Sequence, residues 1–130
     1  MSKGFLHYIE LYVSNSKRSI DFWGWFLDEM GDEPFQEWES GRSWRLGEMY
    51  IVLVQAETRF LDIPYHRGRV GLNHLAFHAA SRQQVDEVAR KVKGIVTTIY
   101  ADKHPFAGGK DHYFLYYEDP DRMKVEFVAP

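Results

Sequence analysis

The chain has 130 residues, enough for one domain with a core, and its 45% apolar and 16% aromatic residues exclude an intrinsically disordered protein. A formal net charge of −3 without any run of Lys and Arg argues against a nucleic-acid partner. No apolar stretch approaches the roughly 20 residues of a membrane span, and the start MSKGFLHY has no signal-peptide core, so we expect a cytoplasmic protein that binds no membrane.

The first half of the chain predicts a strand, a helix and three further strands. Leu6–Val13 alternates apolar and polar residues with the period of a strand. SNSKRSIDFWGWFLDEMG then has capping residues, apolar residues at helical spacing and Gly31 as a stop, which predicts a helix. After a break at Pro34, three extended segments follow: Phe35–Glu39, Ser43–Leu46 and Met49–Gln55.

The second half repeats this order after a linker, which we place at residues 58–70. GLNHLAFHA predicts a strand, and SRQQVDEVARKVKG predicts a helix with Ser81 and Gln84 in capping-box positions. Three strands complete this half: Ile95–Tyr100, His112–Tyr117 and Met123–Val128. We therefore expect module 1 at about residues 5–57 and module 2 at about residues 71–130.

The two halves can be aligned residue by residue. An offset of 66 sets Tyr8 against His74 and pairs the apolar residues of the two first strands. An offset of 74 aligns the two last strands and sets Val52 against Glu126. Matching His7 with His74 would turn one strand's apolar face over, because strand side chains alternate. Tyr8 therefore holds the place of His74, and we expect His7 to point to the helix side or to lie at the strand's frayed end.

Three stretches carry a family pattern: YIELYVSNSKRSIDFW, NHLAFHAASRQQVDEVA and, most specifically, YYEDPDRMKVEFV. Together they resemble the vicinal oxygen chelate superfamily, the group of glyoxalases, bleomycin-resistance proteins and extradiol dioxygenases. The resemblance implies an α+β fold in which two βαβββ modules form a pair of curved half-barrels, as a single domain of residues 1–130. It also implies that the half-barrels enclose a divalent metal and a small substrate, with ligands in the first and last strand of each module.

By position, the resemblance implies ligand places at Tyr8, Val52, His74 and Glu126. His74 and Glu126 are usual metal ligands, so we predict them as the metal-binding residues. Tyr8 replaces the expected histidine, and Val52 has no ligand atom, so the predicted site is degenerate. Arg122 stands where this turn usually has glycine, which implies a somewhat different turn.

Other side chains could complete the site, because a catalytic zinc usually keeps three protein ligands. Glu126 and Glu10 are the candidate catalytic residues, since a carboxylate in a cleft can move a proton. The candidate substrate-binding residues are Tyr8, His78, His112, Tyr116 and Trp44. Plainer interpretations stay open: a solvated carboxylate for Glu10, hydrogen-bonded or surface histidines, and a space-filling ring for Tyr8.

Two functions remain open, and the sequence leaves uncertain whether the protein is an enzyme. In the first, a divalent metal (Zn, Ni, Mn or Fe) at the degenerate site serves a lyase, isomerase or dioxygenase that acts on a small chelating oxygenated substrate. In the second, a metal-free protein resembling bleomycin-resistance proteins sequesters an aromatic small molecule. The His74–Glu126 pair favours the first function, and Tyr8 and Val52 favour the second. We expect a homodimer, because half-barrels leave sheet edges to cover and the helix segment FWGWF has excess apolar surface.

Overall fold

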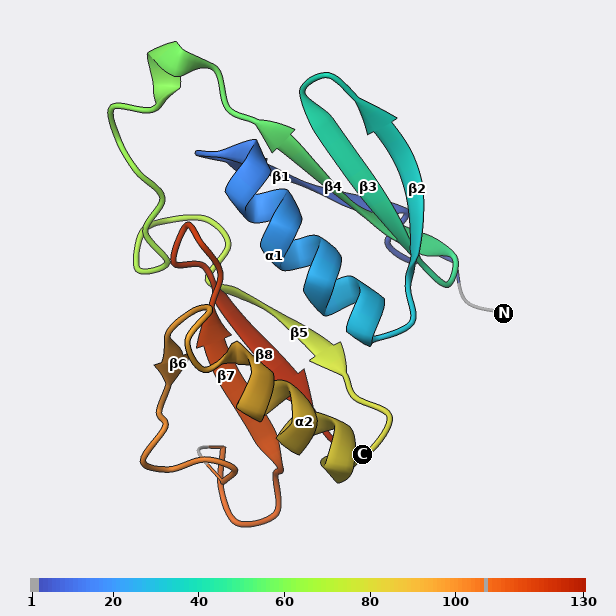
Figure 1. Cartoon of the computed structure of the whole chain (residues 1–130), viewed down its shortest axis with the longest axis vertical. Helices are drawn as coiled ribbons and strands as arrows, with labels where there is room; N and C mark the ends of the chain where they lie inside the picture. The colour runs from blue at the N-terminus through green and yellow to red at the C-terminus, as the bar shows by residue number, and fades with distance from the viewer. Residues whose placement is uncertain (1–2, 107) are drawn as a thin grey trace. The chain divides into compact units, whose positions relative to one another are not determined.

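The computed structural model defines residues 3–106 and 108–130, and Met1, Ser2 and Ala107 lie outside the described residues (Figure 1). The chain divides into two compact units between Pro64 and Tyr65, inside the expected linker. Each unit contains a four-stranded sheet and a helix that follows the first strand. The α+β fold with two βαβββ modules, expected from the sequence, is confirmed.

Unit 1 consists of β1 (Tyr8–Val13), α1 (Ser16–Glu29), β2 (Glu33–Trp38), β3 (Gly41–Leu46) and β4 (Met49–Gln55), followed by the short 3-10 helix η1 (Thr58–Phe60). The sheet order is β1-β4-β3-β2, with β1 parallel to β4 and the other pairs antiparallel. The break expected at Pro34 is wrong, because Pro34 lies inside β2. A proline is tolerated there because β2 is an end strand whose register shifts between Pro34 and Gln36.

Unit 2 consists of β5 (His74–His78), α2 (Arg82–Val92), β6 (Thr98–Ile99), β7 (Phe114–Glu118) and β8 (Lys124–Val128). The sheet order is β5-β8-β7-β6, with β5 parallel to β8. Strand β6 is shorter than the stretch expected from the sequence, and β7 begins after His112 rather than at it. His112 therefore belongs to the connection that precedes β7.

Helix α1 begins at Asn15, whose side chain accepts a hydrogen bond from the Arg18 backbone N–H. Phe22, Trp23 and Phe26 on this helix are almost completely buried. For these three residues, the expectation of an excess apolar surface for a dimer is wrong, because they belong to the core, whereas Trp25 is only partly buried. Within the residues that the structure describes, no helix is both long and apolar enough to cross a membrane.

Helix α2 begins at Ser81, whose hydroxyl accepts the Gln84 backbone N–H, while the Gln84 side chain accepts the N–H of Ala80. The expected capping pair of Ser81 and Gln84 is thus present. The bond that Gln84 accepts comes from Ala80, the residue before the cap. The helix residues Val85, Val88 and Val92 are fully buried, as are the sheet residues Leu115, Tyr117, Val125 and Phe127. Since side chains alternate along a strand, the remaining face of this sheet carries the predicted site.

The two parallel strand pairs have the same register. Tyr8 lies opposite Tyr50 in the β1–β4 pair, and His74 lies opposite Lys124 in the β5–β8 pair. His74 lies 66 residues after Tyr8, and Lys124 lies 74 residues after Tyr50, which are the two offsets found in the sequence. The residue-by-residue alignment of the two halves is therefore confirmed.

Candidate functional site

His74 and Glu126 lie close together on one face of the unit 2 sheet. Ala76 pairs with Glu126 across β5 and β8, so His74, two residues before Ala76, points to the same face as Glu126. The Nε2 atom of His74 lies 3.8 Å from Oε1 of Glu126. The Glu126 side chain is 13% exposed and the His74 side chain is 37% exposed. The two atoms are thus near enough to share one bound ion or one donor group.

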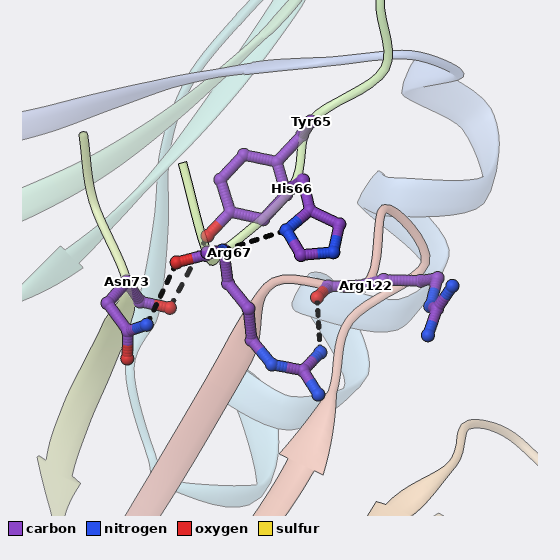
Figure 2. A pocket seen from close by; sticks show the side chains of 6 residues that line it. Tyr65, His66, Arg67, Asn73 and Arg122 are labelled. Atoms are coloured by element: carbon purple, nitrogen blue, oxygen red, sulfur yellow. Dashed lines mark hydrogen bonds between the residues drawn. The ribbon is translucent and has the colours of Figure 1, made fainter. Parts of the chain in front are cut away.

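Asn73 determines how His74 presents its ring. The Nδ2 group of Asn73 donates to the Arg67 carbonyl at 2.9 Å, so Oδ1 is the amide atom that faces His74 (Figure 2). This Oδ1 lies 2.7 Å from Nδ1 of His74, which must therefore be the donor. In the neutral ring, the lone pair is then on Nε2, the atom that faces Glu126. The sequence patterns give Asn73 no role, although it directly precedes the predicted ligand.

Tyr116 holds the carboxylate of Glu126 from the neighbouring strand. The two residues are direct partners in the β7–β8 pair, and the Tyr116 hydroxyl donates a hydrogen bond to Glu126. Burial first, and then this hydrogen bond and the negative charge of Glu126, raise the pKa of Tyr116 to about 12. Tyr116 is therefore a neutral hydrogen-bond donor at pH 7.

Lys124 adds a positive charge to the same face. Its Nζ lies 4.6 Å from the ring centroid of Tyr116 and 5.1 Å from that of Tyr100. The same Nζ lies 3.5 Å from the Tyr100 hydroxyl. The sequence patterns do not single out Lys124 or Tyr100, although Lys124 lies two residues before Glu126 on the same strand.

His78 and His112 do not lie beside the His74–Glu126 pair. His78 is four residues after His74, and the rise along a strand separates them by about 13 Å. The His112 ring lies 5.3 Å from that of Phe114, which lies 6.1 Å from that of Tyr116. His112 thus begins an aromatic row that leads to Tyr116, whereas His78 is exposed at the end of β5.

In unit 1, the equivalent face carries Tyr8 and Glu10. The Tyr8 ring stacks on Tyr50 with 4.9 Å between centroids, and the His7 ring contacts both at 5.4 and 5.2 Å. His7 precedes β1, as a frayed strand end would, but its ring is not turned to the helix side. Glu10 is exposed and pairs with Val52, which has no ligand atom.

Trp44 lies on the other face of the unit 1 sheet. Its neighbour Ser43 is the strand partner of Val52, and successive side chains of β3 point to opposite faces. Trp44 is 3% exposed, and a Cβ atom added at Gly24 of α1 would lie 3.4 Å from its indole. Trp44 is also among the residues that line a pocket along β2 and β3. A part of Trp44 in substrate binding stays a prediction.

A divalent metal fits the His74–Glu126 pair in ligand type. An imidazole lone pair and a carboxylate oxygen suit Zn, Ni, Mn or Fe, and here the two converge. The pair alone supplies fewer than the three protein ligands of a usual catalytic zinc. Among residues 3–106 and 108–130, no three His, Asp or Glu side chains form a group that could hold a metal. The pair therefore fits a metal whose other positions are taken by water or by substrate oxygens.

Comparison with known proteins finds close relatives over the whole length. No protein-family model matches the chain. YqjT of Bacillus subtilis (strain 168), an uncharacterized protein, is 56% identical over 127 residues, which cover 96% of this chain and 98% of YqjT. The crystal structure of a candidate glyoxalase from Bacillus halodurans is 51% identical, with a TM-score of 0.96 over 98% of this chain and 97% of that one.

A more distant structure shares the fold. The glyoxylase/bleomycin resistance protein/dioxygenase domain from Frankia sp. EAN1pec is 19% identical, with a TM-score of 0.70 over 99% of this chain and 93% of that one. Its two-module architecture is the one that the sequence patterns predict for this chain. From the fold and these relatives, we conclude that the chain belongs to the vicinal oxygen chelate superfamily of glyoxalases, bleomycin-resistance proteins and dioxygenases.

Proposed function

We propose that the protein is a small-molecule enzyme of the glyoxalase or dioxygenase type, which acts on a chelating oxygenated substrate at His74 and Glu126 with a divalent metal (Zn, Ni, Mn or Fe). The observation that carries this proposal is the 3.8 Å approach of Nε2 and Oε1. Each of the two groups is held by its own partner, Asn73 for His74 and Tyr116 for Glu126. A metal bound here would act as a Lewis acid that polarises the substrate oxygens.

The side chains of this face would bind the substrate and move a proton. Glu126 is the first candidate for the proton transfer, because its carboxylate is largely buried and oriented by Tyr116. Glu10 of unit 1 is the second candidate, on the face that also carries Tyr8. Lys124 favours a substrate with negative charge on its oxygens.

A second function, metal-free binding of an aromatic small molecule, is favoured by exposed rings in unit 1. Tyr8 is 46% exposed and Phe35 is 41% exposed, and both contact Tyr50, at 4.9 and 5.2 Å between centroids. The guanidinium of Arg45 lies 4.3 Å from the centroid of the Phe35 ring. Such rings offer a surface on which a planar ligand can stack. This function agrees with the absence of a ligand atom at Val52.

We also propose that the protein works as a homodimer. Strand β2 ends the unit 1 sheet, and all six of its residues are exposed. An open strand edge of this kind is usually covered by another chain or by other elements. Sedimentation at micromolar concentration is expected to give about twice the chain mass of 15.3 kDa. A mass near that of one chain would contradict the homodimer.

Elemental analysis tests the metal. Protein purified without chelator is expected to contain about one divalent ion per chain, as one ligand pair allows. His74→Ala should lose this ion, because half of the pair is gone. The matched control is His78→Ala, which removes an imidazole from the same strand and should keep the metal. If the unmodified protein takes up none of the four ions, even after incubation with each, this enzyme proposal is wrong.

Binding of a planar aromatic probe separates the two functions. Tryptophan fluorescence can follow the titration before and after treatment with a chelator. If the aromatic probe carries oxygen atoms that can bind a metal, the enzyme proposal predicts that removing the metal with the chelator weakens its binding. The metal-free function predicts equal binding in both states and a loss in Tyr8→Ala, because the stacked surface is reduced.

A further inference from the structure

Unit 2 contains a cavity of about 270 Å³ formed by the segment before β5 and the turn between β7 and β8 (Figure 2). Two arginines and one histidine are among the residues that line it, and these residues include no Asp or Glu. The lining residues are Tyr65, His66, Arg67, Gly68, Asn73 and Arg122. The cavity is thus distinct in composition from the His74–Glu126 pair, although Asn73 contacts both.

Two of the hydrogen-bond acceptors among the lining side chains are already in use. Nδ1 of His66 accepts the Gly68 backbone N–H at 2.9 Å, so the neutral ring carries its proton on Nε2. Oδ1 of Asn73 faces His74 at 2.7 Å. What these residues can still offer to a ligand is therefore mainly N–H donors, as an anion requires.

The Arg67 side chain is held by hydrogen bonds that use only some of its N–H donors. Its Nη1 donates to Oε1 of Glu118 at 2.9 Å and to the Arg122 carbonyl at 3.2 Å. A guanidinium has five N–H donors, and within the described residues the side-chain hydrogen bonds of Arg67 are donated by Nη1 alone. The side chain is 30% exposed, so its remaining donors are accessible.

The second arginine, Arg122, also has donors that its protein contact does not use. The Glu118 carboxylate, 10% exposed, contacts Arg67 at 2.9 Å and Arg122 Nε at 3.4 Å. Within the described residues, the Arg122 guanidinium makes its contact through Nε, and its side chain is 74% exposed. Its two Nη groups are therefore available to a ligand.

The backbone at Arg122 supports a use for this side chain. Its φ is +66°, in the left-handed region that favours glycine, and Gly47 in the β3–β4 turn has φ +63°. Arginine thus adopts at this position a conformation that glycine would take, and the somewhat different turn expected here stays a prediction. Strain of this kind, retained at a residue beside a pocket, points to a function of the side chain.

We propose that this cavity is an anion site that binds the carboxylate or phosphate group of a small molecule through Arg67, Arg122 and Nε2–H of His66. A carboxylate or phosphate has two oxygens bonded to the same carbon or phosphorus atom, and these match the parallel N–H groups of a guanidinium. Such contacts are therefore both strong and directional. The site does not depend on the function proposed for His74 and Glu126. It is connected to them through Asn73, so an occupant would also change the surroundings of His74.

NMR titration of the isotope-labelled chain with inorganic phosphate, and separately with acetate, tests the proposal at constant ionic strength. The backbone N–H signals of Gly68 and Asn73 are expected to shift and saturate. Arg122→Gln should weaken phosphate binding about tenfold, the usual effect of losing one charge-assisted contact. The control is Arg59→Gln, an exposed arginine of unit 1 with the same change of charge, which should bind as the unmodified chain does.

Two further variants separate binding from folding. Arg122→Gly suits the left-handed backbone, so it should keep the thermal unfolding midpoint while it loses affinity at least as much as the glutamine variant. Gly68→Ala keeps every charge but places a Cβ 3.0 Å from the His66 ring, which should shift the ring and weaken binding.

Saturation with one probe identifies the class of anion, and saturation with both supports the shared chemistry. If neither probe shifts the signals at tens of millimolar, or if Arg122→Gln and Arg59→Gln bind alike, the anion site is wrong. Metal content is measured separately, so this outcome is independent of the His74–Glu126 proposal.

Discussion

The two units share a strand register but differ in the chemistry at one pair of positions. Glu10 on β1 lies opposite Val52 on β4 in unit 1, whereas Ala76 on β5 lies opposite Glu126 on β8 in unit 2. Each pair combines a carboxylate with an apolar residue. The carboxylate is on the first strand in unit 1 and on the last strand in unit 2. The ladder tolerates both arrangements because backbone hydrogen bonds do not depend on which strand carries the charge.

The surroundings of the two carboxylates differ more than their positions. Glu126 is 13% exposed, is bonded by Tyr116 and faces His74. Glu10 is exposed at the equivalent level of unit 1. A carboxylate held by neighbours needs less reorganisation to bind a ligand than a solvated one. The comparison therefore assigns the organised chemistry to unit 2 and the aromatic surface to unit 1.

The largest expected effects test what the units share. Leu53 and Phe127 hold equivalent positions in the last strand of each unit, and both are fully buried. Leu53→Ala should lower the free energy of unfolding by about 2–5 kcal/mol and Phe127→Ala by about 3–5 kcal/mol, through lost contacts and residual cavities. Urea unfolding followed by tryptophan fluorescence measures both.

The control for these core changes is Tyr12→Ala. Tyr12 is 63% exposed on the other face of β1, so its loss should cost about 0.5 kcal/mol or less. A cost as small as this for Leu53→Ala or Phe127→Ala would show that the two helix-side cores are not equivalent.

The next effect tests how the carboxylates differ. Glu126→Gln removes the charge that helps to raise the pKa of Tyr116 to about 12, so this pKa should fall towards 10 while burial keeps it above that value. An NMR titration of the Tyr116 ring carbon next to oxygen measures the change. Glu10→Gln is the matched control and should leave the Tyr116 titration as it is, because the neighbours that raise this pKa are Glu126 and Tyr100.

The same substitution changes stability at high pH. Tyr116 keeps its proton up to about pH 12 in the folded chain but only to about pH 10 when unfolded, so its contribution is present below pH 10 and is lost between 10 and 12. In Glu126→Gln, this alkaline loss should be smaller. An unchanged loss would mean that Glu126 does not act on Tyr116.

The placement of Tyr8 and His74 could be predicted because strand alternation permits only one register that keeps the apolar faces together. The choice of His74 and Glu126 came from the family resemblance, and the register gave their position on the strands. The anion cavity could not be predicted, since Arg67 reaches the β7–β8 turn through a connection without periodicity. The tautomer of His74 likewise depends on a loop side chain, Asn73.

Burial on α1 shows a different limit of prediction. Helical spacing identifies the helix, but it does not say how wide an apolar stripe the sheet will cover. Phe22 and Phe26 lie inside that stripe here, whereas the sequence alone permitted them on a free surface. The burial of these two side chains depends on the facing strands β3 and β4, and no local sequence pattern in the helix predicts it.

The smallest expected effect concerns the helix ends. Gly31 after α1 and Gly94 after α2 both have positive φ, 86° and 84°, but the next residue is Asp32 in unit 1 and Ile95 in unit 2. An apolar residue is usual at this position, where it packs back on the helix. Oδ2 of Asp32 is buried without a hydrogen-bond partner among the described residues, and burial raises the pKa of Asp32 from 3.8 to about 6.

Asp32→Asn should therefore stabilise the protein at pH 7 but not at pH 3. Because the folded pKa is the higher one, the favourable contribution of protonated Asp32 is present below pH 3.8 and is lost as the pH rises through about 6. The gain at pH 7 should stay below about 1 kcal/mol, since much of the group is still solvated. Urea unfolding at both values measures it, with Glu33→Gln at the exposed next residue as control. An equal gain at both pH values would assign the effect to packing and not to the buried charge.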